Sequence, residues 1–139
     1  MLKRIDRDEL YMGIASLFAK RGTCKRNQVG CSLVKDGRVI CSGYNGNLAG
    51  ADHCNPNICD VTQPCTKAIH AEANAIAFAA KKGISLQSST IYCTFSPCLK
   101  CAELIIQAGI SEVVYLEEYR DVAPLALLDN HKIHVRKIN

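Results

Sequence analysis

The sequence lacks an apolar run that approaches the roughly 20 residues needed to cross a membrane. Its start, MLKRIDRDEL, has no apolar core of the kind found in secretion signals, so we expect a cytoplasmic protein. It also lacks a continuous basic stripe, because the residues behind its net charge of +4 are scattered along the chain. We therefore predict no membrane and no nucleic-acid partner, and favour a small anionic ligand.

Internal repeats and linkers are also absent. The 139 residues, of which 48% are hydrophobic and 22% charged, predict one soluble domain over residues 1–139. Nine cysteines are many for such a chain. In a reducing compartment they are expected to act as metal ligands or as small buried hydrophobes, because disulfides do not persist there.

Hydrophobic periodicity and turn residues predict helices over residues 6–22, 70–82, 96–109 and 123–131. In the third of these, Ser96 is the expected N-cap and Pro97 the first helical residue. Strands are predicted over residues 29–35, 38–44, 90–95, 112–116 and 133–138, the first two joined by an Asp-Gly hairpin turn. Residues 45–66 show almost no periodicity. A loop of this length is usually functional or held by a ligand.

This order of elements begins with a hairpin and continues through β-α-β crossovers. It predicts an α/β fold of three layers, α/β/α, with a mixed five-stranded sheet and helices on both faces. Right-handed crossovers would place the two central helices side by side on one face.

Two predicted helix starts carry metal-binding chemistry: HAE, with His70 and Glu72, and PCLKC, with Cys98 and Cys101. The two cysteines are three positions apart, so their sulfurs fall on one side of the first turn. One histidine and two cysteines provide three ligands. A zinc ion with three protein ligands keeps an open position for water, as catalytic sites do.

Glu72 then has a function, because a carboxylate beside that water can carry its proton at neutral pH. H-x-E followed by P-C-x-x-C is the signature of zinc nucleobase deaminases. Alone, a C-x-x-C pair also occurs in redox sites, structural metal sites and sites without function, and an H-x-E helix start arises by chance. Together at two helix starts they favour a catalytic zinc held by His70, Cys98 and Cys101.

Several further motifs make the chain resemble the deoxycytidylate (dCMP) deaminases of the cytidine deaminase superfamily: RGTCKRNQVG, GYNG, IHAEANAI, TFSPCLKCAELIIQAGI and VVYLEEYRD. The resemblance implies a cytidine deaminase-like fold and a hydrolase that converts dCMP to dUMP and ammonia in dTTP biosynthesis. It also implies that Glu72 protonates N3 of the ring and then the departing amine. The enzyme could act on dCTP as well.

By the same resemblance, Arg26 lies near the substrate phosphate, and Asn45 hydrogen-bonds the sugar. An ordinary surface charge and an Asn-Gly turn are the alternatives for these two. Gly43 and Gly46 would let the backbone approach the ligand. The backbone around Thr94, Ser96 and Pro97 would bind the exocyclic amine. Of the aromatic residues near base and sugar, Tyr119 is preferred, because Tyr115 lies in a strand and is expected to pack in the core.

Seven cysteines remain. Cys31, Cys41 and Cys93 fall in predicted strands and are expected to be buried. Cys24, Cys54, Cys59 and Cys65 fall in loops, which suggests a second, closed Cys₄ zinc site that holds residues 45–66 and supports Arg26. Structural zinc sites of this kind in microbial relatives, at positions matching Cys24, Cys54 and Cys65, agree with this hypothesis. His53 could replace one thiolate.

Two other functions remain open. A tRNA adenosine deaminase shares HAE and PCxxC, but it needs a basic footprint for the nucleic acid. A non-catalytic, zinc-stabilised binding module would gain nothing from Glu72. The resemblance further implies a homohexamer, with dCTP and dTTP as effectors near residues 45–50 and Mg²⁺ accompanying them. The helix that contains AELIIQAGI would supply either part of a subunit interface or a buried core face.

Overall fold

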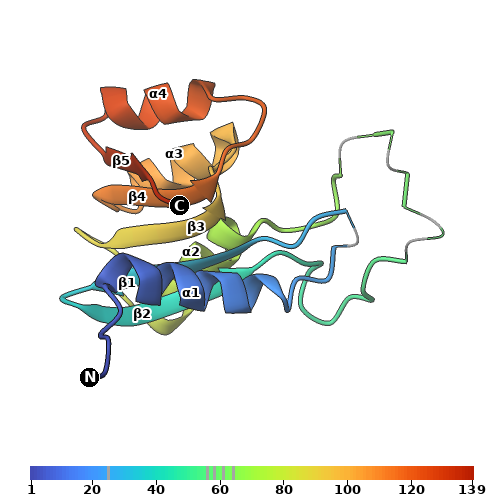
Figure 1. Ribbon diagram of the computed structural model, residues 1–139. Coiled ribbons are helices and arrows are strands. Elements are labelled where there is room, and N and C mark those ends of the chain that lie inside the picture. The colour runs from blue at the N-terminus through green and yellow to red at the C-terminus, as the bar shows by residue number, and fades with distance from the viewer. Residues whose placement is uncertain (25, 56, 58, 61, 64) are drawn as a thin grey trace.

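The computed structural model describes residues 1–24, 26–55, 57, 59–60, 62–63 and 65–139. Within these residues, four helices and five strands follow one another. They are α1 (Arg7–Ala19), β1 (Gly30–Lys35), β2 (Arg38–Tyr44), α2 (Ala71–Lys82), β3 (Thr90–Phe95), α3 (Leu99–Gln107), β4 (Glu112–Glu117), α4 (Ala123–Asn130) and β5 (His134–Lys137). Figure 1 shows them arranged around a single sheet.

The sheet is mixed, as predicted. Its strand order is β2-β1-β3-β4-β5. β1 pairs antiparallel with both β2 and β3, whereas β3, β4 and β5 run parallel. At the hairpin turn, Asp36 and Gly37 both have positive φ angles, 52° and 74°. Two positive φ angles in succession match the twist of the flanking strands, which is why Asp-Gly is favoured there.

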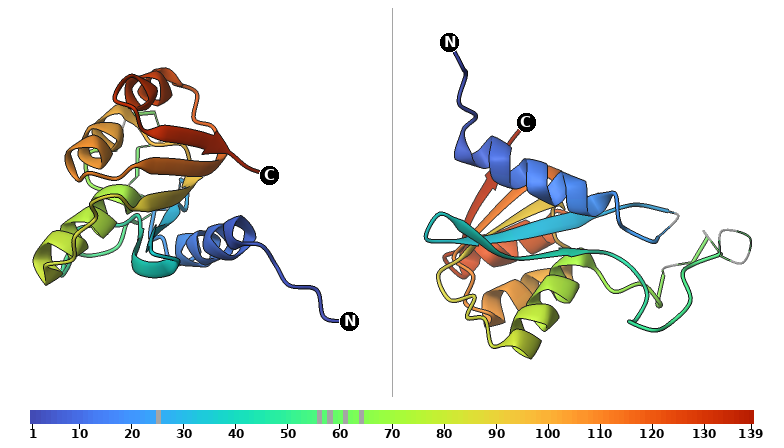
Figure 2. Two further views of the ribbon diagram at one scale, coloured as in Figure 1. Left: turned by 90° about the vertical axis from the view of Figure 1, so that its left-hand side faces the viewer. Right: turned by 90° about the horizontal axis from the view of Figure 1, so that it is seen from below.

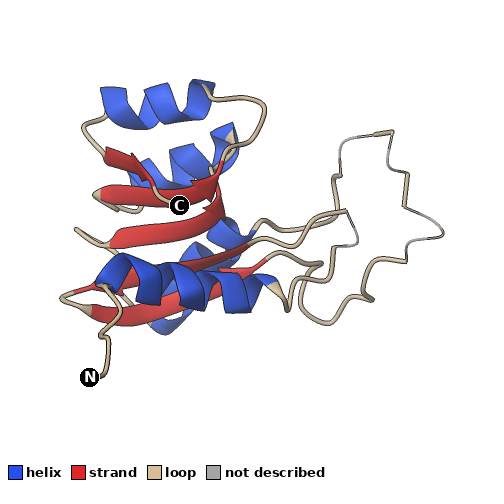
Figure 3. Ribbon diagram, viewed as in Figure 1, coloured by secondary structure: helices blue, strands red, loops and turns tan. Residues whose placement is uncertain are grey.

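Helices cover both faces of the sheet (Figures 2 and 3). On one face, α1 packs Tyr11, Met12 and Ala15 against Tyr92 and Val114 of the sheet. On the other, α2, α3 and α4 contribute to the larger core, whose buried members include Ala75, Ile105 and Leu128. The predicted three-layer architecture and the placement of α2 and α3 on one face are confirmed.

The side of α1 that faces the sheet differs from the apolar stripe visible in its sequence. Leu10 and Leu17, at helical spacing, are 42% and 64% exposed. The buried side instead carries Ala15 and Ala19, which let the helix approach β1 closely: a Cβ on Gly30 would lie 2.1 Å from the carbonyl oxygen of Ala15. Close backbone packing at Ala15 and Ala19, together with the burial of Tyr11 and Met12, therefore sets the orientation of this helix.

The start of α3 is a second correction. The expected N-cap was Ser96, but the helix begins at Leu99 with Cys98 as its N-cap. Ser96 is fully buried, and its hydroxyl accepts a hydrogen bond from the Tyr119 amide at 2.9 Å instead of capping α3. The shift matters for function, because it puts Cys98 at the helix end itself.

Among the described residues, no helix combines the length and the apolar character that crossing a membrane would require.

Candidate metal centre and active site

The two residues that open α2 and α3 share an unusual position. His70 and Cys98 are both N-cap residues with extended backbones, and neither side chain caps its helix. N-caps are normally Ser, Thr, Asp or Asn, whose oxygens bond the free amides of the first turn. Here the imidazole and the thiol are left free to bind something else.

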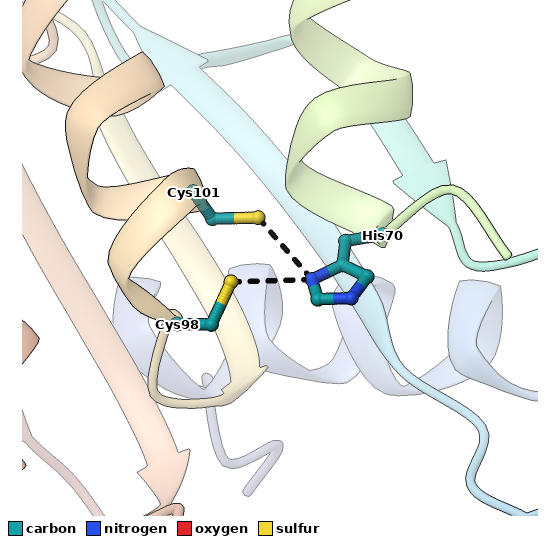
Figure 4. Close-up of side chains that lie close together, drawn as sticks. All are labelled: His70, Cys98 and Cys101. Atoms are coloured by element: carbon teal, nitrogen blue, oxygen red, sulfur yellow. Dashed lines mark hydrogen bonds between the residues drawn. The ribbon is translucent and has the colours of Figure 1, made fainter. Parts of the chain in front are cut away.

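His70, Cys98 and Cys101 converge between the two helices (Figure 4). The Nδ1 atom of His70 lies 3.4 Å from the Cys98 sulfur and 3.5 Å from the Cys101 sulfur. All three ligand atoms lie within 4.8 Å of one another. A nitrogen and a sulfur bound to one tetrahedral zinc at about 2.0 and 2.3 Å stand roughly 3.5 Å apart. The donor set and its spacing therefore fit zinc.

The two thiols are poised to share one proton. A hydrogen bond from Cys101 lowers the pKa of Cys98 to about 4, with a further contribution from His70. The same hydrogen bond, together with burial, raises the pKa of Cys101. The pKa of His70 is raised, chiefly by its hydrogen bond to Cys98. One thiolate thus forms readily at neutral pH, which is the form that binds a metal.

Glu72 lies in the first turn of α2, two residues from His70, and is only 3% exposed. Burial raises the pKa of its carboxyl group, while a hydrogen bond with Cys101 and the charge of His70 lower it. A buried carboxyl group whose pKa is moved toward neutrality is suited to accept and return a proton. The interactions with Cys101 and His70 show that the carboxyl group of Glu72 lies beside the three potential metal ligands.

The start of α2 is fixed by the GYNG segment. Gly46 and Ile69 form an isolated antiparallel bridge, with hydrogen bonds of 3.1 and 2.7 Å. The Asn74 side chain donates to the carbonyl oxygen of Tyr44 at 2.9 Å. A Cβ on Gly43 would lie 2.5 Å from the carbonyl oxygen of Ala71. Gly43 is therefore needed for the packing of α2 on β2, a different reason from the ligand approach expected from sequence.

A cavity of about 590 Å³ opens beside these residues, a volume within the range of small-molecule sites. Its described lining includes eight of the residues predicted from sequence: Cys24, Arg26, Asn45, Cys65, His70, Glu72, Cys98 and Tyr119. Thr94, Ser96 and Pro97 are not among the described residues that line it, so their predicted contact with the exocyclic amine stays a prediction.

Asn45 is buried, and both ends of its amide bond the backbone of the segment before β1. Its Oδ1 accepts from the Val29 amide at 2.9 Å, and its Nδ2 donates to the Asn27 carbonyl oxygen at 2.8 Å. Thr94 acts similarly, because its hydroxyl accepts from the Gly30 amide at 3.1 Å. These two side chains hold the cavity wall in place.

Arg26 lines the cavity but directs its guanidinium toward Cys59, Asp60 and Gln63. It donates to the sulfur of Cys59 at 3.3 Å, to the carbonyl oxygen of Gln63 at 2.7 Å and to that of Asp60. The side chain thereby ties the loop to the segment before β1. Its contact with a substrate phosphate stays a prediction.

Tyr119 lines the cavity, and its contact with the base and sugar stays a prediction. Its ring stacks on Phe95, with centroids 5.3 Å apart and an interplanar angle of 27°. Burial, followed by the charge of Glu72, raises the pKa of its hydroxyl to about 12, so that it stays a hydrogen-bond donor. Tyr115, by contrast, is buried in the core and donates to Glu118 at 2.9 Å, as expected for a strand residue.

The remaining cysteines divide as predicted between core and loops. Cys31, Cys41 and Cys93 are buried at 0%, 6% and 0% exposure, and burial raises the pKa of each thiol. Cys54, Cys59 and Cys65 line a second cavity of about 370 Å³, together with His53 and Arg26. Among the described residues, however, only His70, Cys98 and Cys101 form a group of three or more potential ligands within 4.8 Å. The four loop thiols do not meet in this way.

Two charged residues that line the active-site cavity were missed in the sequence: Arg120 and Asp121, between β4 and α4. The signal available was their position directly after Tyr119 in EEYRD. Charged residues next to a predicted substrate contact at the carboxyl end of a strand are themselves candidates, because ligands bind at that edge of parallel sheets.

Comparison with known proteins agrees with this site. The family model for the cytidine and deoxycytidylate deaminase zinc-binding region matches residues 5–117. ComE operon protein 2 of Bacillus subtilis is 42% identical over 120 residues, which are 86% of this chain and 64% of that protein. Deoxycytidylate deaminase of Saccharomyces cerevisiae is 37% identical over 147 residues, which are 99% of this chain and 46% of the yeast protein. The chain thus spans less than two thirds of both relatives.

The crystal structure of dCMP deaminase from the cyanophage S-TIM5 in complex with dCMP and dUMP superposes with a TM-score of 0.88 at 34% identity. The match covers 99% of this chain and 100% of the phage protein. The matched region of the family model contains both helix starts that form the metal centre. The chain belongs to the zinc-binding cytidine and deoxycytidylate deaminase family.

Proposed function

We propose that the protein catalyses the hydrolytic deamination of dCMP to dUMP and ammonia. The observation that carries this proposal is the buried carboxyl group of Glu72 beside a His-Cys-Cys ligand set, at a cavity large enough for a nucleotide. The similarity to the S-TIM5 dCMP deaminase, whose structure contains dCMP and dUMP, supports this choice of substrate.

His70, Cys98 and Cys101 hold the zinc ion. When bound there, zinc supplies a Lewis acid that makes water acidic enough to lose a proton near neutral pH. The ligands are well suited to this because both helix N-termini stabilise negative charge on the thiolates.

Glu72 moves the protons. Its carboxylate accepts a proton from the water that attacks C4 of the cytosine ring, and the protonated form then donates to N3. The second proton comes from the hydroxyl group added at C4 and passes through the same carboxyl group to the departing amine. The bond between C4 and the amine nitrogen then breaks, so that water and dCMP give dUMP and ammonia. The raised pKa of Glu72 helps both directions of transfer, because general acid–base catalysis is most efficient when the pKa lies near the working pH.

The substrate lies along the cavity wall. Tyr119 packs near base and sugar, Asn45 bonds the sugar, and the backbone of residues 94–97 binds the exocyclic amine. Arg26 is the sequence-based candidate for the phosphate. Support for these roles comes from the lining of the cavity by Arg26, Asn45 and Tyr119.

A second zinc ion binds the loop cysteines, Cys24, Cys54, Cys59 and Cys65. Three of these line one cavity with His53, and the hydrogen bond that the Ala68 amide donates to Cys65 Sγ lowers the pKa of that thiol. Binding would have to draw the four thiols together. The proposal includes a cytoplasmic location, because the cysteines of both zinc sites must stay reduced to bind metal.

The wider functional setting belongs to the same proposal. The enzyme is a homo-oligomer, with a hexamer as the expected form, and dCTP and dTTP, accompanied by Mg²⁺, act as effectors near residues 45–50. It accepts dCTP as a second substrate if the phosphate end of the cavity has room. A cavity that is lined by Gly46, Asn47 and Leu48 gives the effectors a candidate position.

One assay series tests the proposal. The zinc-loaded protein is incubated with dCMP, dCTP or a tRNA anticodon stem-loop, and deamination is followed by ultraviolet absorbance and by product analysis. We expect turnover of dCMP and none of the stem-loop. Activity on the stem-loop without activity on dCMP would identify a tRNA adenosine deaminase, and no activity on any substrate would favour a binding module. Repeating the dCMP assay with dTTP and with dCTP tests regulation.

A further inference from the structure

Three buried thiols of the sheet lie against α2, and the reaction proposed above does not use them. Cys31 in β1 is paired in register with Cys93 in β3, and both are fully buried. Cys41 is buried in β2. All three belong to the larger core, on the side of the sheet where α2 packs. Because buried polar groups normally have hydrogen-bond partners, the partners of these thiols indicate what they do.

Two of the thiols donate to carbonyl oxygens of α2. The Sγ atom of Cys31 lies 3.4 Å from the carbonyl oxygen of Ala71, and that of Cys41 lies 3.1 Å from the carbonyl oxygen of Ala75. A backbone carbonyl oxygen has two lone pairs, so it can accept a thiol in addition to a helix amide. The two acceptors are four positions apart. Thiols from two neighbouring strands thus bind successive turns on the same side of α2.

The contact made by Cys31 bears directly on Glu72. A peptide unit is planar, so the carbonyl oxygen of Ala71 and the Cα atom of Glu72 move together. The same oxygen lies against Gly43, where a Cβ would approach it to 2.5 Å. Gly43 is also the partner of Cys31 in the register of β1 and β2. A strand glycine and a strand thiol therefore support the one peptide unit from which Glu72 extends.

The thiol of Cys31 is held in its neutral form, which can donate. Burial, followed by the charge of Glu72, raises the pKa of Cys31 well above its usual range, and the same two causes act in the same order on Cys93. The carboxyl group of Glu72 is thus close enough for its charge to act on both thiols. A neutral thiol can donate to the Ala71 carbonyl oxygen, whereas a thiolate could only accept.

The strand that carries Cys31 is fixed at the same level of the sheet. The Gly30 amide donates to the hydroxyl of Thr94 at 3.1 Å, which joins β1 to β3 next to the pair formed by Cys31 and Cys93. Thr94 in turn lies four residues before Cys98, a member of the ligand set. Cys31 therefore connects the part of the sheet that leads to the ligand cysteines with the first turn of α2.

We propose that Cys31 is a positioning residue for the deamination reaction, whose thiol holds the peptide unit between Ala71 and Glu72 in place beside the metal centre. The inference rests on the proposed function of Glu72. Reacting groups have to be held within about 0.5 Å of their productive positions, and a misplacement of about 1 Å can cost on the order of 100-fold in rate. Cys41 makes the same kind of contact one turn further along α2, so it supports the helix without setting the position of Glu72.

The contribution of each thiol is tested by substitution. Zinc-loaded wild type is compared with Cys31→Ala and Cys31→Val, which lack the donor, with Cys31→Ser, which keeps one, and with the matched control Cys41→Ala. In Cys31→Ala and Cys31→Val we expect kcat for dCMP to fall on the order of 10-fold, with KM within about 2-fold and the zinc content unchanged. Cys31→Ser should stay within about 3-fold of the wild-type kcat because its hydroxyl can donate, and Cys41→Ala within about 2-fold. Thermal unfolding should show a similar loss of stability in Cys31→Ala and Cys41→Ala, because both remove a buried sulfur.

A second measurement does not depend on turnover. In the cobalt-substituted protein, the visible absorption spectrum reports the surroundings of the metal ion, which a displaced Glu72 carboxyl group would alter. We expect the spectrum to change in Cys31→Ala and Cys31→Val, and to match the wild type in Cys31→Ser and Cys41→Ala.

Several outcomes would overturn the proposal. These are wild-type kcat in Cys31→Ala or Cys31→Val, an equal loss of kcat in Cys41→Ala, a loss in Cys31→Ser as large as in Cys31→Ala, or loss of zinc together with activity. If the wild type does not deaminate dCMP, the proposed function fails, and the cobalt spectra alone decide the role of Cys31. The expected pattern of spectra then supports that role, and any other pattern contradicts it.

Discussion

Outside the strands, the described residues include two groups of cysteines that differ in how the chain holds them. Cys98 and Cys101 belong to the start of a helix that packs in the main core, and they meet His70 at 3.4 and 3.5 Å. Cys24, Cys54, Cys59 and Cys65 lie in segments without regular structure, and their sulfurs, all within the described residues, do not come together. The comparison teaches that helix ends and core packing can prepare a metal site in advance, whereas a loop site has to be organised by the metal it binds.

The largest expected effect comes from removing a ligand of the helix-held site. In Cys101→Ala, bound zinc and activity should both be lost, with dCMP turnover at least about 1,000-fold lower, because the remaining two ligands cannot hold the ion in a catalytic geometry. Metal analysis and a dCMP assay measure this. Wild-type activity in the zinc-loaded variant would show that Cys101 is not a ligand of the catalytic ion.

A smaller effect separates binding from chemistry at the same site. In Glu72→Gln, kcat should fall on the order of 1,000-fold while the zinc content stays as in the wild type, because the amide cannot carry protons. The side chain is nearly isosteric, so the fold and the cavity should persist. If zinc were lost along with activity, Glu72 would be needed for the metal and not for proton transfer.

Removing a cysteine from the loop group should change the zinc content more than the activity. In Cys59→Ser, zinc should fall from about two ions per chain to about one. Activity should fall by only roughly 10-fold, because the loop acts on the active site through Arg26. Inductively coupled plasma mass spectrometry of native protein checks the metal count, with Cys41→Ser, a buried strand thiol, as the control. One zinc per chain in the wild type would remove the second site altogether.

The smallest effect concerns the ion pair between Arg136 and Asp8, which contacts neither cysteine group. Arg136 donates to both carboxylate oxygens of Asp8, at 2.8 and 3.1 Å, and Tyr92 donates to Asp8 at 2.6 Å. These hydrogen bonds, with that of Arg136 the strongest, lower the pKa of Asp8 to about 2. Because the pair is partly exposed, we expect Asp8→Asn to lower the free energy of unfolding at pH 7 by only about 1 kcal/mol.

The pH dependence of that effect follows from its sign. A carboxyl group with a lowered pKa in the folded state stabilises the protein above its unfolded value of about 4 and loses this contribution as the pH falls through about 2. Urea unfolding of the wild type and Asp8→Asn at pH 7 and at pH 2.5 should show the difference shrinking. A constant difference would mean that the charge of Asp8 contributes nothing, and both proteins should keep the same zinc content.

The metal centre could be predicted from sequence because its parts are local. H-x-E and P-C-x-x-C each lie within one helix turn, and a strand between two helices fixes how the helices meet. The direction of Arg26 could not be predicted, since it depends on carbonyl oxygens that lie 34 and 37 residues away. The hydrogen bond between Ser96 and Tyr119 could not be predicted for the same reason, because the two residues lie 23 positions apart in the sequence.

The sequence by itself determined the order of elements, the Asp-Gly hairpin and the three potential metal ligands that converge, His70, Cys98 and Cys101. Each of these depends on backbone propensity or on side chains only a few positions apart. Only the tertiary structure decided which face of α1 is buried, why Gly43 must be glycine, and which residues the guanidinium of Arg26 contacts. Those outcomes depend on close backbone contacts and on competition for hydrogen bonds between distant segments, which no local pattern encodes.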